Sequence, residues 1–93
     1  MKERRVVIRN RAGIHCRPSA VILNAIRDEF PGYRFEISAP AGDAELGSML
    51  DLLSLELAQG TEAVLKVDGP EPEKALKRIG DLLEHEFDFP PRG

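Results

Sequence analysis

Tryptophan is absent from this 93-residue chain, and aromatic residues make up only 5% of it. Proteins that bind single-stranded nucleic acid by base stacking need aromatic side chains, so this class of protein is disfavoured. The formal net charge of -3 points the same way, because a surface that binds DNA or RNA needs clustered positive charge to match the phosphates. We therefore expect no nucleic-acid partner.

The single cysteine, Cys16, cannot form a disulfide within the chain, which fits a reducing compartment. Long hydrophobic runs are also missing: none approaches the roughly 20 residues of a membrane-spanning helix, and the apolar run after Arg5 is too short for a signal peptide. We expect a cytoplasmic monomer without a membrane segment. It should form a single domain over residues 1–88, with a flexible tail over residues 89–93.

Four segments have the pattern of β-strands. Residues 4–9 are a β-branched run with charged ends, and residues 33–38 alternate apolar with polar side chains. Residues 44–46 follow turn-forming residues and predict a short returning strand. Residues 61–68 predict a fourth strand, with Ala63, Leu65 and Val67 on one face.

Three segments predict helices. The first has Pro18 in its first turn and ends before Pro31; the third begins at Pro72 and pairs Glu73 with Lys77. The second opens with Ser48 as N-cap and Asp51 three residues later, a short-armed capping box, and continues to Gly60. The expected core residues of the first and third helices are Val21, Ile22, Ala25, Ile26, Ala75, Leu76, Ile79, Leu82 and Leu83.

The order of elements is therefore strand, helix, strand, strand, helix, strand, helix. A sheet covered by helices on one face would bury all of these apolar stripes. The sequence predicts an α+β fold, an open-faced β-sandwich in which three helices cover one face of a four-stranded antiparallel sheet.

The stretch Asn10–Ser19 places His15 immediately before the first helix. A helix N-terminus carries unpaired backbone N–H groups and a partial positive charge, which favour a phosphate or another anion. A neutral imidazole is also a nucleophile near pH 7. His15 is therefore a candidate for carrying charge or a phosphoryl group.

The second helix has more apolar residues than one helix face can bury. Met49, Leu50 and Leu53 share a face, and an exposed apolar patch of that kind is typical of a protein contact surface. A second set of candidate contact residues forms a row along the first helix, starting next to His15. The expected docking residues on the two helices are Cys16, Ala20, Asn24, Arg27, Met49, Leu50 and Leu53.

Two signatures together resemble the histidine-containing phosphocarrier family HPr of the bacterial phosphotransferase system. The first is made of Asn10, Gly13, Ile14, His15, Arg17 and Pro18. The second is a serine that opens an apolar helix, in Gly47–Leu50 and Leu52–Leu55, and the following Gln59–Gly60 also fits. The resemblance covers nearly the whole chain, and it implies the HPr-like form of the open-faced sandwich.

The resemblance implies a phosphocarrier rather than an enzyme, with no cofactor and no metal. His15 would accept a phosphoryl group on Nδ1 from Enzyme I, which takes it from phosphoenolpyruvate, and pass it to a IIA domain of a sugar permease. Arg17 would stabilise the phosphoryl oxygens. Ser48 resembles the regulatory serine that an HPr kinase/phosphorylase modifies in some bacteria, which recruits a transcriptional regulator.

Other interpretations of these residues remain open. His15 could be an exposed loop histidine without a task, Ser48 a plain N-cap, and Leu50 and Leu53 core residues. The chain could also be a regulatory HPr-like protein, of the nitrogen branch or the catabolite-repression type, that acts mainly by binding other proteins. A thiol enzyme that uses Cys16 is a third possibility, but no second acid or base completes a relay.

Three residues depart from the family pattern. Asp51 and Glu56 stand where small residues, often glycine, are usual, and Asn24 stands where a basic residue is common. These changes make the docking surface more negative, which disfavours partners with acidic rims.

Overall fold

Seven elements follow one another in the computed structural model, which describes residues 1–87. The strands are β1 (Lys2–Val7), β2 (Arg34–Ala39), β3 (Gly42–Glu45) and β4 (Glu62–Asp68). The helices are α1 (Cys16–Glu29), α2 (Met49–Ser54) and α3 (Pro72–Leu83). The predicted order of elements is confirmed, whereas the predicted tail over residues 89–93 lies outside the described residues.

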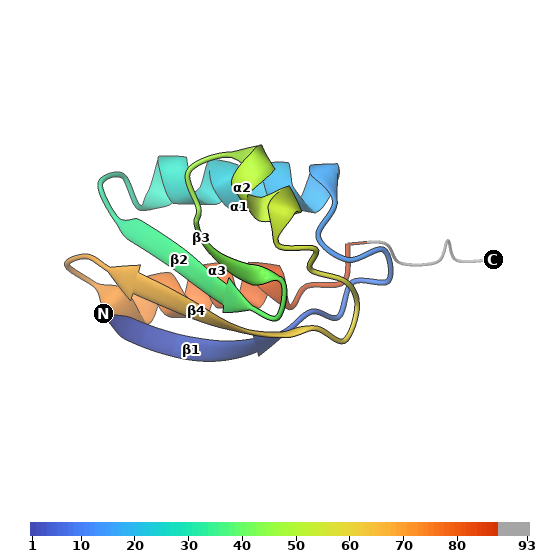
Figure 1. The fold of residues 1–93 in the computed structure, drawn as a ribbon. Coiled ribbons are helices and arrows are strands. Elements are labelled where there is room, and N and C mark those ends of the chain that lie inside the picture. The colour runs from blue at the N-terminus through green and yellow to red at the C-terminus, as the bar shows by residue number, and fades with distance from the viewer. Residues whose placement is uncertain (88–93) are drawn as a thin grey trace.

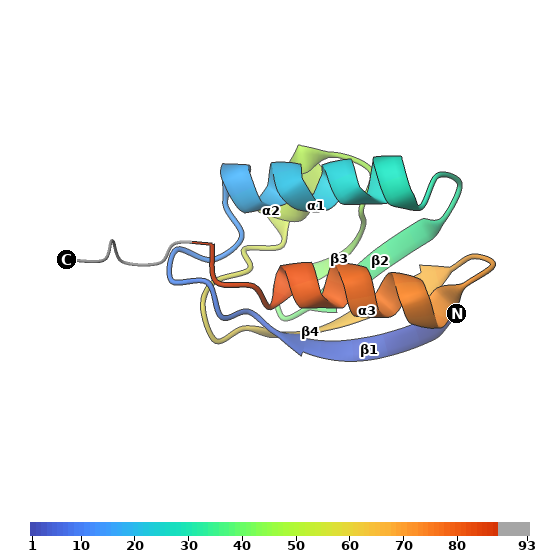
Figure 2. The ribbon, with the colours of Figure 1, turned by 180° about the vertical axis from the view of Figure 1, so that it is seen from behind.

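The four strands form one antiparallel sheet in the order β1-β4-β2-β3. Figure 1 shows α3 behind this sheet, and Figure 2 shows α1 and α3 together in front of it. α2 packs against α1, so all three helices lie on the same side and the other sheet face stays uncovered. The predicted open-faced sandwich is confirmed.

The core lies between the sheet and the helices. Alternate residues of β2 and β4 point into it, as predicted: Phe35, Ile37, Leu65 and Val67 are at most 1% exposed. The third helix buries four of the five residues of its predicted stripe, with Ile79 and Leu83 fully covered, whereas Leu82 is half-buried. These contacts hold α3 over the sheet, and α1 packs against α2 and α3.

One predicted core position in α1 is wrong. Val21 is 39% exposed, whereas the buried residues of this helix are Pro18, Ser19, Ile22 and Ala25. Successive residues on a helix are about 100° apart, so a buried face centred on Ile22 leaves Val21 beside it. The core-facing stripe of α1 therefore begins at Pro18, in its first turn.

The second helix ends earlier than predicted. It stops at Ser54 instead of continuing to Gly60, and Glu56 then adopts a left-handed conformation with φ 51°. Both Leu55 and Leu57 are buried after the helix has ended. Packing of these two leucines therefore overrides the helical pattern and turns residues 55–60 toward the loop that precedes α1.

A polar network joins the edge strand β1 to α3. The guanidinium of Arg4 donates to Oδ1 of Asp81 and Oε1 of Glu84, both at 3.1 Å, and the backbone N–H of Val7 donates to Oε2 of Glu84 at 2.9 Å. Hydrogen bonds from Lys77 and Arg4 lower the pKa of Asp81. Lys77 pairs with Asp81 instead of the predicted Glu73, because Arg4 brings Asp81 into the network.

Ser19 is the polar exception in the buried face of α1. Its side chain is 0% exposed, and its hydroxyl has no hydrogen-bond partner among the described residues. Because a buried unpaired hydroxyl is costly, Ser19→Ala should raise the free energy of unfolding by about 1 kcal/mol, as measured by urea denaturation. Ser54→Ala is the control, since the exposed Ser54 hydroxyl donates to the carbonyl of Asp51 at 2.7 Å. If the free energy of unfolding of Ser19→Ala is equal to or below that of the unchanged protein, this explanation is wrong.

Candidate functional site

The loop between β1 and α1 is shaped by Asn10 and Gly13. The buried Asn10 side chain donates from Nδ2 to the Gly13 carbonyl at 2.7 Å, and the Gly13 N–H donates back to the Asn10 carbonyl at 2.9 Å. Gly13 has φ 73°, and a Cβ there would collide with the carbonyl oxygen of Leu57. Only glycine fits this close approach.

The chain that follows α2 holds this loop in place. The Ile14 N–H donates to the Leu57 carbonyl at 2.8 Å, and the Gly60 N–H donates to the Ile8 carbonyl at 2.7 Å. Figure 1 shows this yellow-green segment beside the blue loop. Residues far apart in sequence therefore fix the backbone that leads into His15.

His15 is the N-cap residue of α1, as predicted. It has extended backbone angles, its carbonyl accepts the Ser19 N–H at 3.0 Å, and its side chain makes no capping bond. The first-turn N–H groups of Cys16 and Arg17 have no carbonyl within the helix to bond, and Pro18 has no N–H. No acidic side chain lies in this turn, so the positive end of the helix dipole stays available beside His15.

Arg17 is the exposed cation of the first turn. Its Nη2 donates to the carbonyl of Phe87 at 3.2 Å, and the Phe87 ring meets that of His85 edge to face at 4.7 Å. Both ribbon views show the red segment after α3 beside the blue loop. No local sequence pattern indicates this contact, because the two residues are 70 positions apart in the chain.

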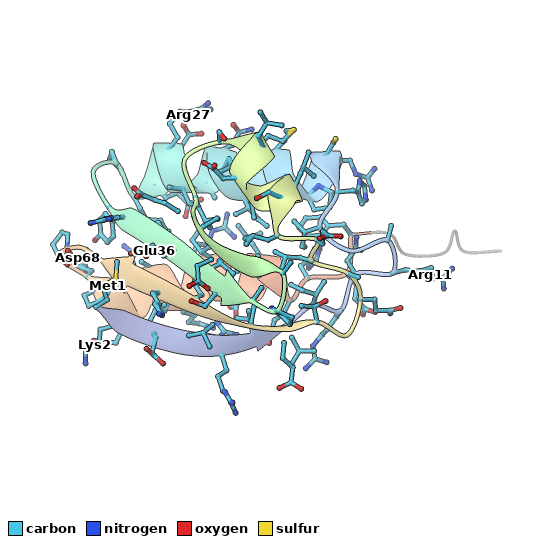
Figure 3. All side chains as sticks on the ribbon, viewed as in Figure 1. Met1, Lys2, Arg11, Arg27, Glu36 and Asp68 are labelled. Atoms are coloured by element: carbon cyan, nitrogen blue, oxygen red, sulfur yellow. The ribbon has the colours of Figure 1, made fainter. Side chains whose placement is uncertain are left out.

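The predicted row on α1 runs along a groove between α1 and α2 with a volume of about 410 Å³. Figure 3 shows Arg27 on the outer surface of α1, and Leu50 on α2 is 77% exposed. The exposed Cys16 lies at the start of the same helix. Ala20, Leu23, Asn24, Ile26, Arg27, Leu46, Gly47 and Met49 line the groove, so four of the seven predicted docking residues share it.

A second, shallower hollow of about 310 Å³ lies at His15 itself. Leu53, one of the three predicted docking residues outside the groove, is half-buried and lines this hollow. The lining residues are Ala12, Ile14, His15, Leu53, Glu56, Leu57 and Ala58. The structure thus brings His15, an apolar surface and Glu56 together at the N-terminal end of α1.

The sequence model of the family PTS-HPr, described as "PTS HPr component phosphorylation site", matches residues 2–85. The chain belongs to the HPr family. The phosphocarrier protein HPr of Mycoplasma pneumoniae is 31% identical over 88 residues, 90% of this chain and 94% of that protein. The phosphocarrier protein NPr of Escherichia coli K12 is 29% identical over 86 residues, 89% of this chain and 91% of that protein.

The fold agrees with this assignment. The crystal structure of HPr-C-His from Thermoanaerobacter tengcongensis matches with a TM-score of 0.79 and 27% identity, over 90% of this chain and 92% of that one. The HPr family consists of phosphocarrier proteins of the phosphotransferase system, so this chain is a carrier rather than a classical enzyme. Its family interacts with components of that system.

The second family signature lies at the start of α2. Ser48 is its N-cap, as predicted, and the exposed hydroxyl accepts the Asp51 N–H at 3.3 Å. This hydroxyl therefore has a structural task in the HPr fold.

Two features are absent from the part of the chain that the structure describes: a cluster of metal-ligating side chains and a membrane-spanning helix. Over residues 1–87, no group of three or more His, Cys, Asp or Glu side chains could hold a metal ion. Within the same range, no helix is long and apolar enough to cross a membrane.

Proposed function

We propose that His15 accepts a phosphoryl group from Enzyme I and passes it to a IIA domain of the phosphotransferase system. The observation that carries this proposal is the position of His15 as N-cap of α1, with Arg17 in the first turn, in a chain of the HPr family. A cytoplasmic carrier of this kind has no substrate pocket of its own.

The transfer is an in-line displacement. The lone pair of His15 Nδ1 forms the N–P bond while the bond between phosphorus and the donor atom breaks. The first turn of α1 faces the added negative charge with its dipole. Arg17 carries five N–H donors, so it can bind a phosphoryl oxygen while it keeps its bond to the Phe87 carbonyl.

Partner proteins would dock on the groove between α1 and α2 and on the hollow at His15. Apolar area comes from Ala20, Met49 and Leu53, which line these hollows, and from the exposed Leu50, whereas polar contacts come from the rim of α1. Enzyme I and the IIA domain would use this surface in turn, because each must bring its reacting group to the same histidine.

The test is phosphorylation in vitro. Phosphoenolpyruvate and Enzyme I from the same organism should add one acid-labile phosphate, seen by mass spectrometry of the intact protein. His15→Ala should abolish this adduct, whereas the control His85→Ala should retain it. Absence of the adduct in the unchanged protein, or its persistence in His15→Ala, would refute the proposal.

A second candidate function is regulation through Ser48, and the exposed hydroxyl of Ser48 beside the docking groove favours it. A phosphate there would place charge at the surface that partners must cover. Incubation with ATP and an HPr kinase/phosphorylase should then give an acid-stable phosphate that Ser48→Ala lacks. In the regulatory interpretation this form also binds a transcriptional regulator while His15 stays unmodified.

A further inference from the structure

Glu56 combines an unusual backbone with a position at the site. Its φ of 51° lies in the left-handed region, which is unfavourable for residues other than glycine. Hydrogen bonds hold it there: its N–H donates to the Leu53 carbonyl at 3.2 Å, and the Ala58 N–H donates to its carbonyl at 2.9 Å. A glycine would adopt this conformation without strain, so the backbone alone does not explain a glutamate.

The neighbours of Glu56 fix the position of its backbone. Leu55 is 2% exposed and Leu57 is 4% exposed, whereas Glu56 between them is exposed. The Leu57 carbonyl accepts the Ile14 N–H, one residue before His15. Burial of both leucines and this bond therefore hold Glu56 at the edge of the His15 hollow, where it is the one carboxylate among the seven lining residues.

A partner that delivers a phosphoryl group to His15 must cover this hollow. Covering the Glu56 carboxylate removes water from it, which is unfavourable unless the partner supplies a hydrogen-bonded cation. Two basic residues also lie near this site: Arg17 is in the first turn of α1, and Arg11 projects from the loop that precedes that helix (Figure 3). Glu56 is therefore the acidic residue of a site that also has two arginines nearby.

We propose that Glu56 is a specificity-determining residue that pairs with a lysine or arginine presented by the phosphoryl donor at the His15 hollow. This inference rests on the proposed function of His15. It selects donors with a basic group opposite the end of α2, and it rejects donors that present a carboxylate there.

Two substitutions separate the charge from the strain. Glu56→Gln removes the charge and keeps a side chain in the left-handed conformation, whereas Glu56→Gly removes both. Each should raise the KM for this protein as phosphoryl acceptor from Enzyme I by about fivefold, with kcat unchanged. Only Glu56→Gly should also raise the Tm, by about 4 °C.

Salt dependence and a matched control complete the experiment. Raising the ionic strength should raise the KM of the unchanged protein more than that of Glu56→Gln, because the variant lacks one of the screened charge pairs. Glu36→Gln removes a carboxylate from β2 on the uncovered sheet face and should leave both constants unchanged. An unaltered or lowered KM in Glu56→Gln, with normal labelling of His15, would overturn this inference alone. Failure of the unchanged protein to become labelled would overturn the proposed function together with it.

Discussion

Gly13→Ala is expected to destabilise the protein by about 2–4 kcal/mol and to slow phosphoryl acceptance severely. Two costs add at this position: a left-handed φ of 73°, and a Cβ that would collide with the Leu57 carbonyl. That carbonyl accepts the Ile14 N–H, so relief of the collision must break or lengthen the bond that places His15. Urea denaturation and the rate of phosphohistidine formation measure the two effects.

Gly32→Ala provides the matched control. Gly32 has φ 84°, close to that of Gly13, but a Cβ there would have no atom within 4 Å. The free energy of unfolding of Gly32→Ala should therefore fall by about 1 kcal/mol, which is the cost of the left-handed backbone alone. Phosphoryl acceptance should stay normal. Equal destabilisation by the two substitutions would mean that the contact with Leu57 contributes nothing.

The parts of the fold that follow from local patterns could be predicted. Alternation in residues 33–38 and 61–68 identified two strands, because one face of each is buried and the other is not. Pro18 placed the start of α1 correctly, because proline is tolerated in the first turn of a helix. Pro18 and the helical apolar pattern that follows it were sufficient to place His15 at a helix N-terminus.

The parts that depend on distant contacts could not be predicted. The early end of α2 follows from burial of Leu55 and Leu57 beneath the site loop, and the apolar pattern alone favoured a longer helix. The contact between Arg17 and Phe87 joins residues that are 70 positions apart in the chain. The departure of Glu56 from the family pattern was visible in the sequence, but its strain and its place in the His15 hollow were not.

Replacing Arg17 should have the largest effect on transfer after loss of the histidine itself. If Arg17 stabilises the phosphoryl oxygens as proposed, Arg17→Ala should lower kcat/KM for phosphoryl acceptance by about 10²–10³. Because its side chain is exposed, the Tm should change little. Arg17→Lys should recover part of the rate, since lysine supplies charge without the planar set of donors.

Arg11→Ala distinguishes this role from a general effect of positive charge. Arg11 is also exposed and lies at the same end of the molecule, but it precedes α1 and is outside its first turn (Figure 3). Its loss should weaken attraction between the two proteins slightly and raise KM less than about threefold, with kcat unchanged. Arg17→Ala should instead lower kcat, because its contact forms with the phosphoryl group in flight. If the two variants changed kcat and KM in the same way and by the same factor, Arg17 would act only through its contribution to the surface charge.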